Sequence, residues 1–398
     1  MKSFAIVLVC YNRLLGVERL LKSLENADYN GRNDIVLIFS IDNSGTKTVE
    51  DFAKAYKWIH GEKLIRTFTQ RQGLKNHILQ CGDFTEKYDI VAVFEDDIYA
   101  SESFYNYAYQ AAEYYWDDDK IAGISLYGYE KHWLNWAFRF EPMKAEYDNY
   151  FLKVAQSWGQ VWTGPKWKRF REWYKQNMEF TFSDSIPLKL NYWVESSWLK
   201  YHIRYCIETN RYFVYPYVGL STNFSDAGVH TNSTTPMYQC NLQFKKKDFC
   251  FVPFDSDSII YDEYMERENL GKAIKIPNDE LTVDLHGTRN KNMRKKFFLS
   301  AEILDFKVIA SYAYDLRPIE ANVLLNIPGS IIKLYDTTQY VRNSEKFDLD
   351  YYRMVYNMRY NEPIKILNFA FKVLLHNMNR IKNIPRRIRR TFLKKRIK

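Results

Sequence analysis

Three consecutive carboxylates stand at the end of an apolar run in this chain. Glu95, Asp96 and Asp97 directly follow residues 90–94, IVAVF, which have the composition of a buried strand. Successive side chains of a strand point to opposite faces, so the three acids cannot all do one task. A cation relieves their mutual repulsion, and Mg²⁺ or Mn²⁺ needs only one or two protein carboxylates besides substrate phosphates. The pattern favours a metal site, the alternative being a solvated acidic loop before the next helix.

Two further polar stretches follow apolar runs in the same part of the sequence. They are CYNR at residues 10–13 and DNSG at residues 42–45. Ligands of open α/β sheets bind beyond the carboxyl ends of the strands. The three polar stretches therefore predict one ligand site at that edge of a sheet.

The elements that would position these side chains alternate between strand and helix over residues 1–126. Apolar runs rich in β-branched residues, separated by amphipathic helical patterns, predict an α/β domain with a mostly parallel central sheet and helices on both faces. Residues 127–265 are rich in aromatic residues and less regular. The expected strands are 4–9, 34–42, 63–69, 89–94 and 121–126, and the expected helices are 14–24, one from about Leu74, and 102–116.

Several motifs between residue 4 and about residue 231 resemble those of one known family. They are EDD at 95–97, RQGLKNHI at 71–78, SWGQVWTGPKW at 157–167 and the segment 214–231. In these motifs the chain resembles the GT-A glycosyltransferases, especially the branch of N-acetylglucosaminyltransferase I and related bacterial family-2-like enzymes. The resemblance implies the GT-A (nucleotide-diphospho-sugar transferase) fold, a nucleotide-sugar donor with UDP as the expected nucleotide, and Mn²⁺ or Mg²⁺ as the cofactor.

The resemblance also implies which residues hold the metal and the donor. Asp97 is the implied metal ligand. His230 is an implied second ligand of the metal or the diphosphate, the alternative being a loop histidine that binds nothing. The implied donor-site residues are Cys10, Tyr11, Asn12, Arg13, Asp42, Lys75, Glu95 and Asp96.

On the acceptor side, the resemblance points to Glu195 in YWVESSW, residues 192–198. Related segments carry an Asp that acts as general base, and Glu195 stands at the corresponding place with a side chain one methylene longer. The alternative is a surface glutamate on a helix. Gly159 is expected to let the backbone approach the sugar, whereas Trp158 and Trp162 either stack on the acceptor or belong to the core.

Cysteine content and hydropathy bear on the compartment. The five cysteines contain no CxxC pair, which favours reduced thiols and argues against a zinc site. The N-terminus lacks the pattern of a signal peptide, and no stretch has the roughly 20 apolar residues of a spanning helix. The expectation is a cytoplasmic protein.

Basic residues are concentrated at the C-terminal end. From Pro363 onward there are 12 Lys or Arg and no Asp or Glu, although the net charge of the whole chain is only +9. A basic segment with an apolar face suits an anionic membrane surface, so a peripheral location on the cytoplasmic face of the inner membrane is expected. Basic helices also bind phosphate polymers, so an RNA-binding tail is the alternative. The apolar residues of the tail favour the membrane, and a nucleic-acid partner is not expected. The expected apolar face comprises Ile364, Leu367, Phe371, Leu374, Leu375 and Met378.

The sequence thus predicts a GT-A domain at residues 1–265, a C-terminal extension of unknown role at 266–350, and a basic amphipathic helical tail at 351–398. The expected function is transfer of a sugar, with inversion, from a nucleotide sugar to a hydroxyl of a glycan or a lipid-linked acceptor in bacterial surface polysaccharide synthesis. One alternative is a non-catalytic carbohydrate-binding or scaffold protein with the same fold. The other is a sugar nucleotidyltransferase, whose usual Gly/Arg-rich loop after the first strand is missing from CYNRLLG.

Overall fold

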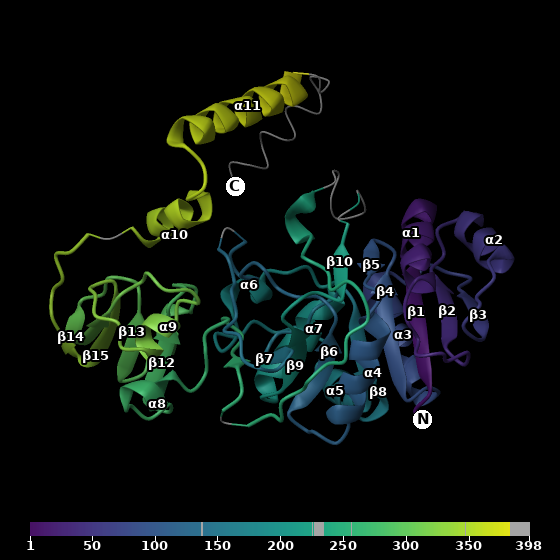
Figure 1. The fold of residues 1–398 in the computed structure, drawn as a ribbon, viewed down its shortest axis with the longest axis horizontal. Coiled ribbons are helices and arrows are strands. Elements are labelled where there is room, and N and C mark those ends of the chain that lie inside the picture. Colours follow the sequence, from purple (N-terminus) through teal and green to yellow (C-terminus); the bar gives the residue numbers. More distant parts are fainter. Residues whose placement is uncertain (137, 225, 227–234, 256, 347, 383–398) are drawn as a thin grey trace. The chain divides into compact units, whose positions relative to one another are not determined.

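The computed structural model describes residues 1–136, 138–224, 226, 235–255, 257–346 and 348–382 (Figure 1). The chain divides into two compact units, residues 1–345 and residues 346–398. All strands of the described residues belong to the first unit.

The central sheet of the first unit has nine strands in the order β11-β7-β9-β6-β8-β4-β1-β2-β3. Five neighbouring pairs are parallel, and the three antiparallel pairs are β8 with β4, β8 with β6, and β7 with β9. The expected mixed α/β architecture with a mostly parallel sheet is therefore confirmed. The strands are β1 (Phe4–Cys10), β2 (Val36–Ile41), β3 (Lys63–Thr67), β4 (Ile90–Glu95), β6 (Ile121–Ser125), β7 (Asn149–Leu152), β8 (Gln160–Thr163), β9 (Tyr212–Pro216) and β11 (Ile260–Tyr261).

Every strand and helix expected in residues 1–126 is present, with ends shifted by a few residues at most. The register of the parallel pairs places Val9 of β1 beside both Ser40 of β2 and Glu95 of β4. The carboxyl ends of these three strands are therefore neighbours, as the expected site requires. The less regular region that follows supplies four more strands of the same sheet, β7, β8, β9 and β11.

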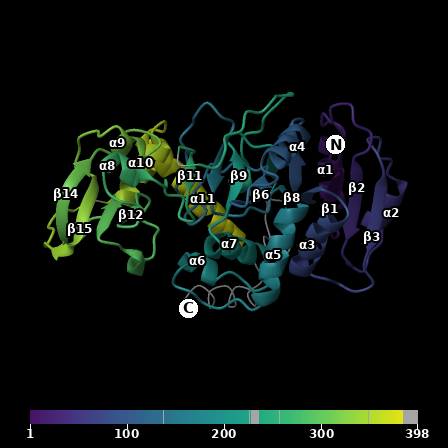
Figure 2. The same ribbon diagram turned by 90° about the horizontal axis from the view of Figure 1, so that it is seen from below.

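Helices cover both faces of this sheet, as the buried strands require. Figure 2 shows α1 and α4 on one side of the strands and α3, α5 and α7 on the other. Each face has its own apolar core. The helices are α1 (Leu14–Glu25), α2 (Thr48–Ala55), α3 (Leu74–Gly82), α4 (Phe104–Tyr114), α5 (Gly164–Gln176), α6 (Leu188–Asn191) and α7 (Trp198–Glu208).

A smaller sheet lies in the C-terminal part of the first unit, with the strand order β12-β13-β15-β14. Its strands lie within residues 266–350, the extension for which the sequence predicted no role. Its elements are β12 (Leu281–Asp284), β13 (Phe297–Ser300), β14 (Phe306–Tyr312) and β15 (Ile332–Tyr340), with the short helices α8 (Leu270–Ile274) and α9 (Ala321–Leu324). A two-stranded ladder pairs β5 (Ile98–Ala100) with β10 (Ser221–Asn223).

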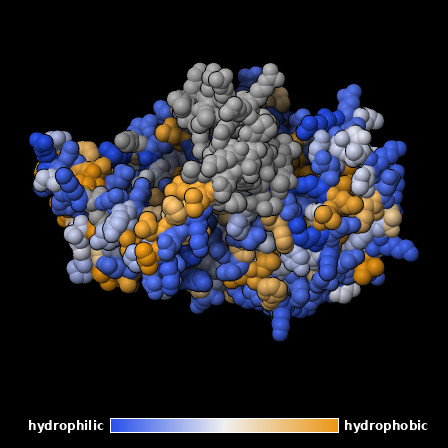
Figure 3. Space-filling view, turned by 90° about the horizontal axis from the view of Figure 1, so that it is seen from above, coloured by the Kyte–Doolittle hydropathy of each residue, from blue (hydrophilic) through white to orange (hydrophobic). Residues whose placement is uncertain are grey.

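The second unit consists of α10 (Leu349–Met358) and α11 (Pro363–Lys382), in agreement with the helical pattern of the sequence. Apolar side chains of α11 are exposed, among them Leu367 and Phe371 at 64% and 61%. Over the described residues, no helix combines the length and the apolar character needed to cross a membrane. Figure 3 shows groups of apolar side chains among hydrophilic ones on the face that it draws.

Candidate active site

The three carboxylates of the EDD motif lie at the carboxyl end of β4. Glu95 is the last residue of this strand, and Asp96 and Asp97 form the turn into β5. Arg13, from the loop after the neighbouring strand β1, pairs through Nη2 with Asp96 and places Nη1 3.4 Å from Asp97 Oδ2. A Cβ at Gly16 would overlap the carbonyl oxygen of Asp96, so this glycine lets α1 pack directly against the acidic turn.

The charges at this turn are not balanced by Arg13 alone. Burial raises the pKa of Asp96 to about 6, although the Arg13 guanidinium opposes this shift. Burial, reinforced by the charges of Asp97 and Asp96, also raises the pKa of Glu95 above its usual range. Burial and mutual repulsion thus favour the protonated forms of Glu95 and Asp96.

Asp97 has a free oxygen atom with the chemistry of a metal ligand. Its Oδ1 is buried and has no hydrogen-bond partner among the described residues. Glu266 Oε2 is the other carboxylate oxygen of this kind in the described part of the chain, but only Asp97 Oδ1 lies at the acidic turn. The described part of the chain contains no group of three His, Cys, Asp or Glu side chains that could hold an ion. One carboxylate with substrate phosphates is a normal shell for Mg²⁺ and Mn²⁺, so the residues present fit such a cation.

Asp42, which follows β2, is buried and organises the loop that starts α3. Its carboxylate accepts hydrogen bonds from the backbone N–H of Gln72 at 2.7 Å and of Gly73 at 3.0 Å. Gly73 has a φ of +72°, which is unfavourable for residues with a Cβ. This loop places Lys75 in the first turn of α3, with Nζ 5.0 Å from the centre of the Tyr201 ring on α7.

The structure brings Glu195 to the same edge of the sheet. Glu195 lies in an exposed turn just before α7, and α7 leads into β9, which runs parallel to β6. The N-terminal end of α7 is therefore at the carboxyl edge of the sheet. Burial lowers the pKa of Lys200, and the charges of Glu195 and Lys75 act on that pKa in opposite directions. Glu195 and Lys75 are thus close enough to act electrostatically on one group.

The residues at the end of β1 and directly after it differ in how far their side chains are exposed. The Cys10 side chain is 1% exposed and belongs to the apolar core, and burial raises the pKa of its thiol, on which the charges of Asp96 and Arg13 also act. Tyr11 is half-buried, with the Arg71 guanidinium 5.1 Å from the centre of its ring, and Asn12 is exposed. In this stretch, exposure of the side chains therefore increases after Cys10.

The tryptophans of the segment 157–167 have separate roles. Trp162 is fully buried, with its ring centre 4.2 Å from that of Trp167, which confirms the core reading for this residue. Trp158 is only half-buried and lies 4.8 Å from Tyr238, ring centre to ring centre. The backbone at Gly159, with a φ of +92°, approaches the side chain of Ser221 in β10.

The motif at residues 214–231 reaches the acidic turn from another side. The Phe224 N–H donates to the Asp97 carbonyl at 2.8 Å, and Asn223 pairs with Ile98 in the β5–β10 ladder. Asp226 pairs with Arg19 of α1, a contact for which the sequence carries no local signal. His230 lies outside the described residues.

Comparison with known proteins gives similarities only at the level of solved structures. No protein-family model matches the chain, and no curated protein matches it. Glycosyltransferases are among the similar solved structures. TarS 1–349 of S. aureus in complex with UDP is 13% identical, with 54% of this chain and 57% of that chain covered and a TM-score of 0.34.

Two further neighbours are glycosyltransferases determined with Mn²⁺. The mannosyltransferase PcManGT from Pyrobaculum calidifontis, in complex with GDP-Man and Mn²⁺, is 12% identical over 55% of this chain and 57% of that chain, with a TM-score of 0.32. GalNAc-T7 with UDP, GalNAc and Mn²⁺ is 12% identical over 63% of this chain and 45% of that chain, with a TM-score of 0.38. The chain thus spans about half of these proteins, and likenesses of this size identify no family.

Proposed function

We propose that the chain is a metal-dependent glycosyltransferase that moves a sugar from a nucleotide sugar to an acceptor hydroxyl. One observation carries the proposal. At the carboxyl edge of a mostly parallel sheet, a buried oxygen of Asp97 that has no partner among the described residues lies beside Arg13 and Asp96. This is the edge at which such sheets bind ligands, and the oxygen is of the kind that a divalent cation requires.

Each residue of the site has a role in this reaction. Asp97 would hold Mn²⁺ or Mg²⁺, which supplies Lewis-acid stabilisation of the diphosphate leaving group. Arg13 and Lys75 bring positive charge to the same edge, where a diphosphate would be placed. Glu195 takes the proton from the acceptor hydroxyl, and this requires hydrogen-bond reach to that oxygen. Attack from the face opposite the leaving group gives inversion at the anomeric carbon.

The finer assignments are supported by the sequence motifs. Their resemblance to the branch of N-acetylglucosaminyltransferase I and to bacterial family-2-like enzymes favours a UDP-sugar as donor. A glycan or lipid-linked acceptor of bacterial surface polysaccharide synthesis is the proposed second substrate. The exposed apolar side chains of α11 and the basic residues that follow favour association with the cytoplasmic face of the inner membrane.

Calorimetry of UDP binding tests the donor site directly. The full chain is titrated with UDP in the presence of Mn²⁺, of Mg²⁺, and of EDTA, and the Asp97→Ala variant is titrated in parallel. Wild type is expected to bind UDP only with a divalent cation, and Asp97→Ala is expected to lose at least tenfold in metal-dependent affinity. Asp34→Ala is a suitable control because that carboxylate is exposed, precedes β2 and is already paired with Arg32.

Binding that is equally strong in EDTA would remove the metal from the proposal. Failure to bind UDP under any condition would transfer the same test to GDP and CMP. If these also failed to bind, a non-catalytic protein with this fold would become the better account.

A further inference from the structure

We infer that Asn290, in the loop after β12, is a positioning residue that holds the segment carrying Glu195. The C-terminal sheet would then be part of the framework of the active site and not an independent appendage. This inference rests on the proposed function for the role of Glu195, whereas the contacts that support it are independent of any function.

Asn290 is 7% exposed and binds the main chain of a segment about a hundred residues earlier. Its Nδ2 donates to the carbonyl oxygens of Asp184 at 3.0 Å and Ile186 at 2.8 Å, and its Oδ1 accepts the Leu188 N–H at 3.3 Å. Leu188 is the first residue of α6, so Asn290 satisfies one of the N–H groups that a helix leaves unpaired at its start. One side chain thus holds three backbone groups within residues 184–188.

The segment held by Asn290 leads directly to the turn with Glu195. The Trp193 N–H donates to the Leu190 carbonyl at 3.2 Å, and the Ser197 N–H donates to the Val194 carbonyl at 3.0 Å. Glu195 lies inside the second of these turns and is itself exposed. Few contacts of its own can therefore fix its carboxylate, and its position depends on the backbone on either side.

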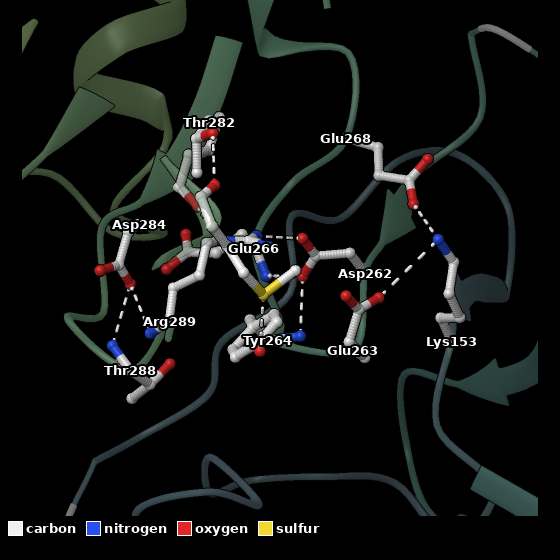
Figure 4. Close-up of polar contacts among 12 residues, drawn as sticks. Lys153, Asp262, Glu263, Tyr264, Glu266, Glu268, Thr282, Asp284, Thr288 and Arg289 are labelled. Carbon is white, nitrogen blue, oxygen red and sulfur yellow. Dashed lines mark hydrogen bonds and ion pairs between the residues drawn. The ribbon is translucent and has the colours of Figure 1, made fainter. Parts of the chain in front are cut away.

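The loop that presents Asn290 is itself held by buried charges (Figure 4). Asp284 Oδ1 accepts the N–H groups of Thr288 at 2.9 Å and Arg289 at 3.2 Å. The Arg289 guanidinium pairs with Asp262 and lies 4.3 Å from the centre of the Tyr264 ring. Because the Arg289 side chain is only 9% exposed, breaking this pair would leave a buried charge, so the loop is stiff.

Residues 184–197 have a second anchor, in the loop that follows β6 of the central sheet. Lys189 Nζ donates to the carbonyl oxygens of Trp133 at 3.2 Å and Leu134 at 3.1 Å. Removal of the Asn290 side chain is therefore expected to loosen residues 184–197 without unfolding them. This is the behaviour of a positioning contact, and it makes the inference testable in a folded protein.

The test is amide hydrogen exchange of the full chain together with sugar-transfer kinetics. In Asn290→Ala, peptides from residues 184–197 are expected to exchange about tenfold faster, the size expected for lost capping hydrogen bonds. The kcat for transfer is expected to fall about tenfold or more, with the KM for the donor unchanged, because only the placement of the base is disturbed.

Asn322→Ala is the matched control. Asn322 is a fully buried asparagine of the same C-terminal part, and its amide binds the backbone of Leu316 and Ile319 within that part. It should leave the exchange of residues 184–197 and the kcat unchanged. Asn290→Asp would set a carboxylate oxygen against the carbonyl oxygens of Asp184 and Ile186, so its effect should be at least as large as that of Asn290→Ala. Asn290→Ser, which keeps a short hydroxyl, serves if Asn290→Ala does not fold.

Faster exchange at residues 184–197 in Asn290→Ala but not in Asn322→Ala supports the inference. Unchanged exchange of this segment in Asn290→Ala overturns it, whatever the activity. The same response in both variants also overturns it, because the effect would then be general destabilisation. If wild type transfers no sugar, the proposed function fails, and the exchange data alone decide whether Asn290 holds the segment.

Discussion

At the scale of single residues, Glu195 is the side chain on which the proposed chemistry depends most. Glu195→Gln keeps the size of the side chain and its exposed position but cannot accept a proton from the acceptor hydroxyl. The kcat for sugar transfer is expected to fall about 10²- to 10⁴-fold, the usual contribution of a general base, while the affinity for the nucleotide is unchanged.

Glu172→Gln serves as the control for this change. Glu172 is an exposed glutamate on α5, so its loss of charge should not alter the rate. Transfer kinetics and UDP binding are measured on both variants and on wild type. If Glu195→Gln transfers sugar at the full rate, another group removes the proton.

The sequence predicted which polar stretches of the site lie together, but not how each of their side chains is oriented or paired. The acidic motif and the polar stretches after β1 and β2 were placed together correctly, because the carboxyl ends of parallel strands share one edge. The orientation of Cys10 could not be predicted. Both faces of β1 are buried, so the apolar pattern does not show to which face its last side chain belongs. The pairing of Arg13 with Asp96 likewise depends on strand register.

At the scale of elements, the junction between the central sheet and the C-terminal sheet contains a buried acid whose titration can be followed. Glu320 stands just before α9, is 5% exposed, and accepts a hydrogen bond from the hydroxyl of Tyr261 in β11. Burial raises the pKa of Glu320 to about 7, although the Tyr261 hydroxyl opposes the shift. The folded protein therefore keeps this proton at pH values at which the unfolded chain has released it.

Since the folded state binds the extra proton, the free energy of unfolding falls as the pH rises between the two pKa values. The loss begins near pH 4.5, where the unfolded glutamate titrates, and is complete above about pH 7. For a shift of this size it amounts to about 3 kcal/mol. Glu320→Gln cannot release a proton and is expected to avoid this loss, so its advantage over wild type grows by about 3 kcal/mol between pH 5 and pH 8.

Urea unfolding at both pH values measures this difference. Glu25→Gln is the matched control, because Glu25 accepts a hydrogen bond from Tyr56 at 2.6 Å in a pair that is exposed to solvent. Its effect should be the same at pH 5 and pH 8. An equal pH dependence for Glu320→Gln and wild type would show that Glu320 is ionised in the folded protein.

Most elements of residues 1–126 followed from the sequence because their apolar residues recur with a clear period, whereas α2 and the short strand β5 were not predicted. The C-terminal sheet was harder to predict, since β12 and β13 have only four residues each and β13 pairs with β15 across the intervening β14 and α9. Its link to the site depends on one amide, that of Asn290. No local pattern distinguishes this residue from any other loop asparagine.

At the scale of the whole molecule, an excess of positive charge lies at the C-terminal end, where apolar side chains of α11 are also exposed. Residues 1–362 carry 45 basic and 48 acidic side chains, whereas all 12 charged side chains from Pro363 onward are basic. On α11, the described side chains of Leu367, Phe371 and Leu374 are each more than 60% exposed. Apolar side chains beside basic ones match the acyl and headgroup layers of an anionic membrane surface.

Vesicle flotation of the full chain tests this interaction. Binding to vesicles with anionic lipid is expected, and deletion of residues 380–398 should weaken it at least tenfold, since each Lys or Arg near such a surface contributes about 1 kcal/mol. Leu374→Gln separates the two contributions: it should weaken binding to anionic vesicles while leaving the dependence on salt unchanged, because it removes apolar contact and no charge. Equal flotation of the full and the shortened chain would contradict the membrane proposal, and retention of RNA by the full chain alone would favour the nucleic-acid alternative.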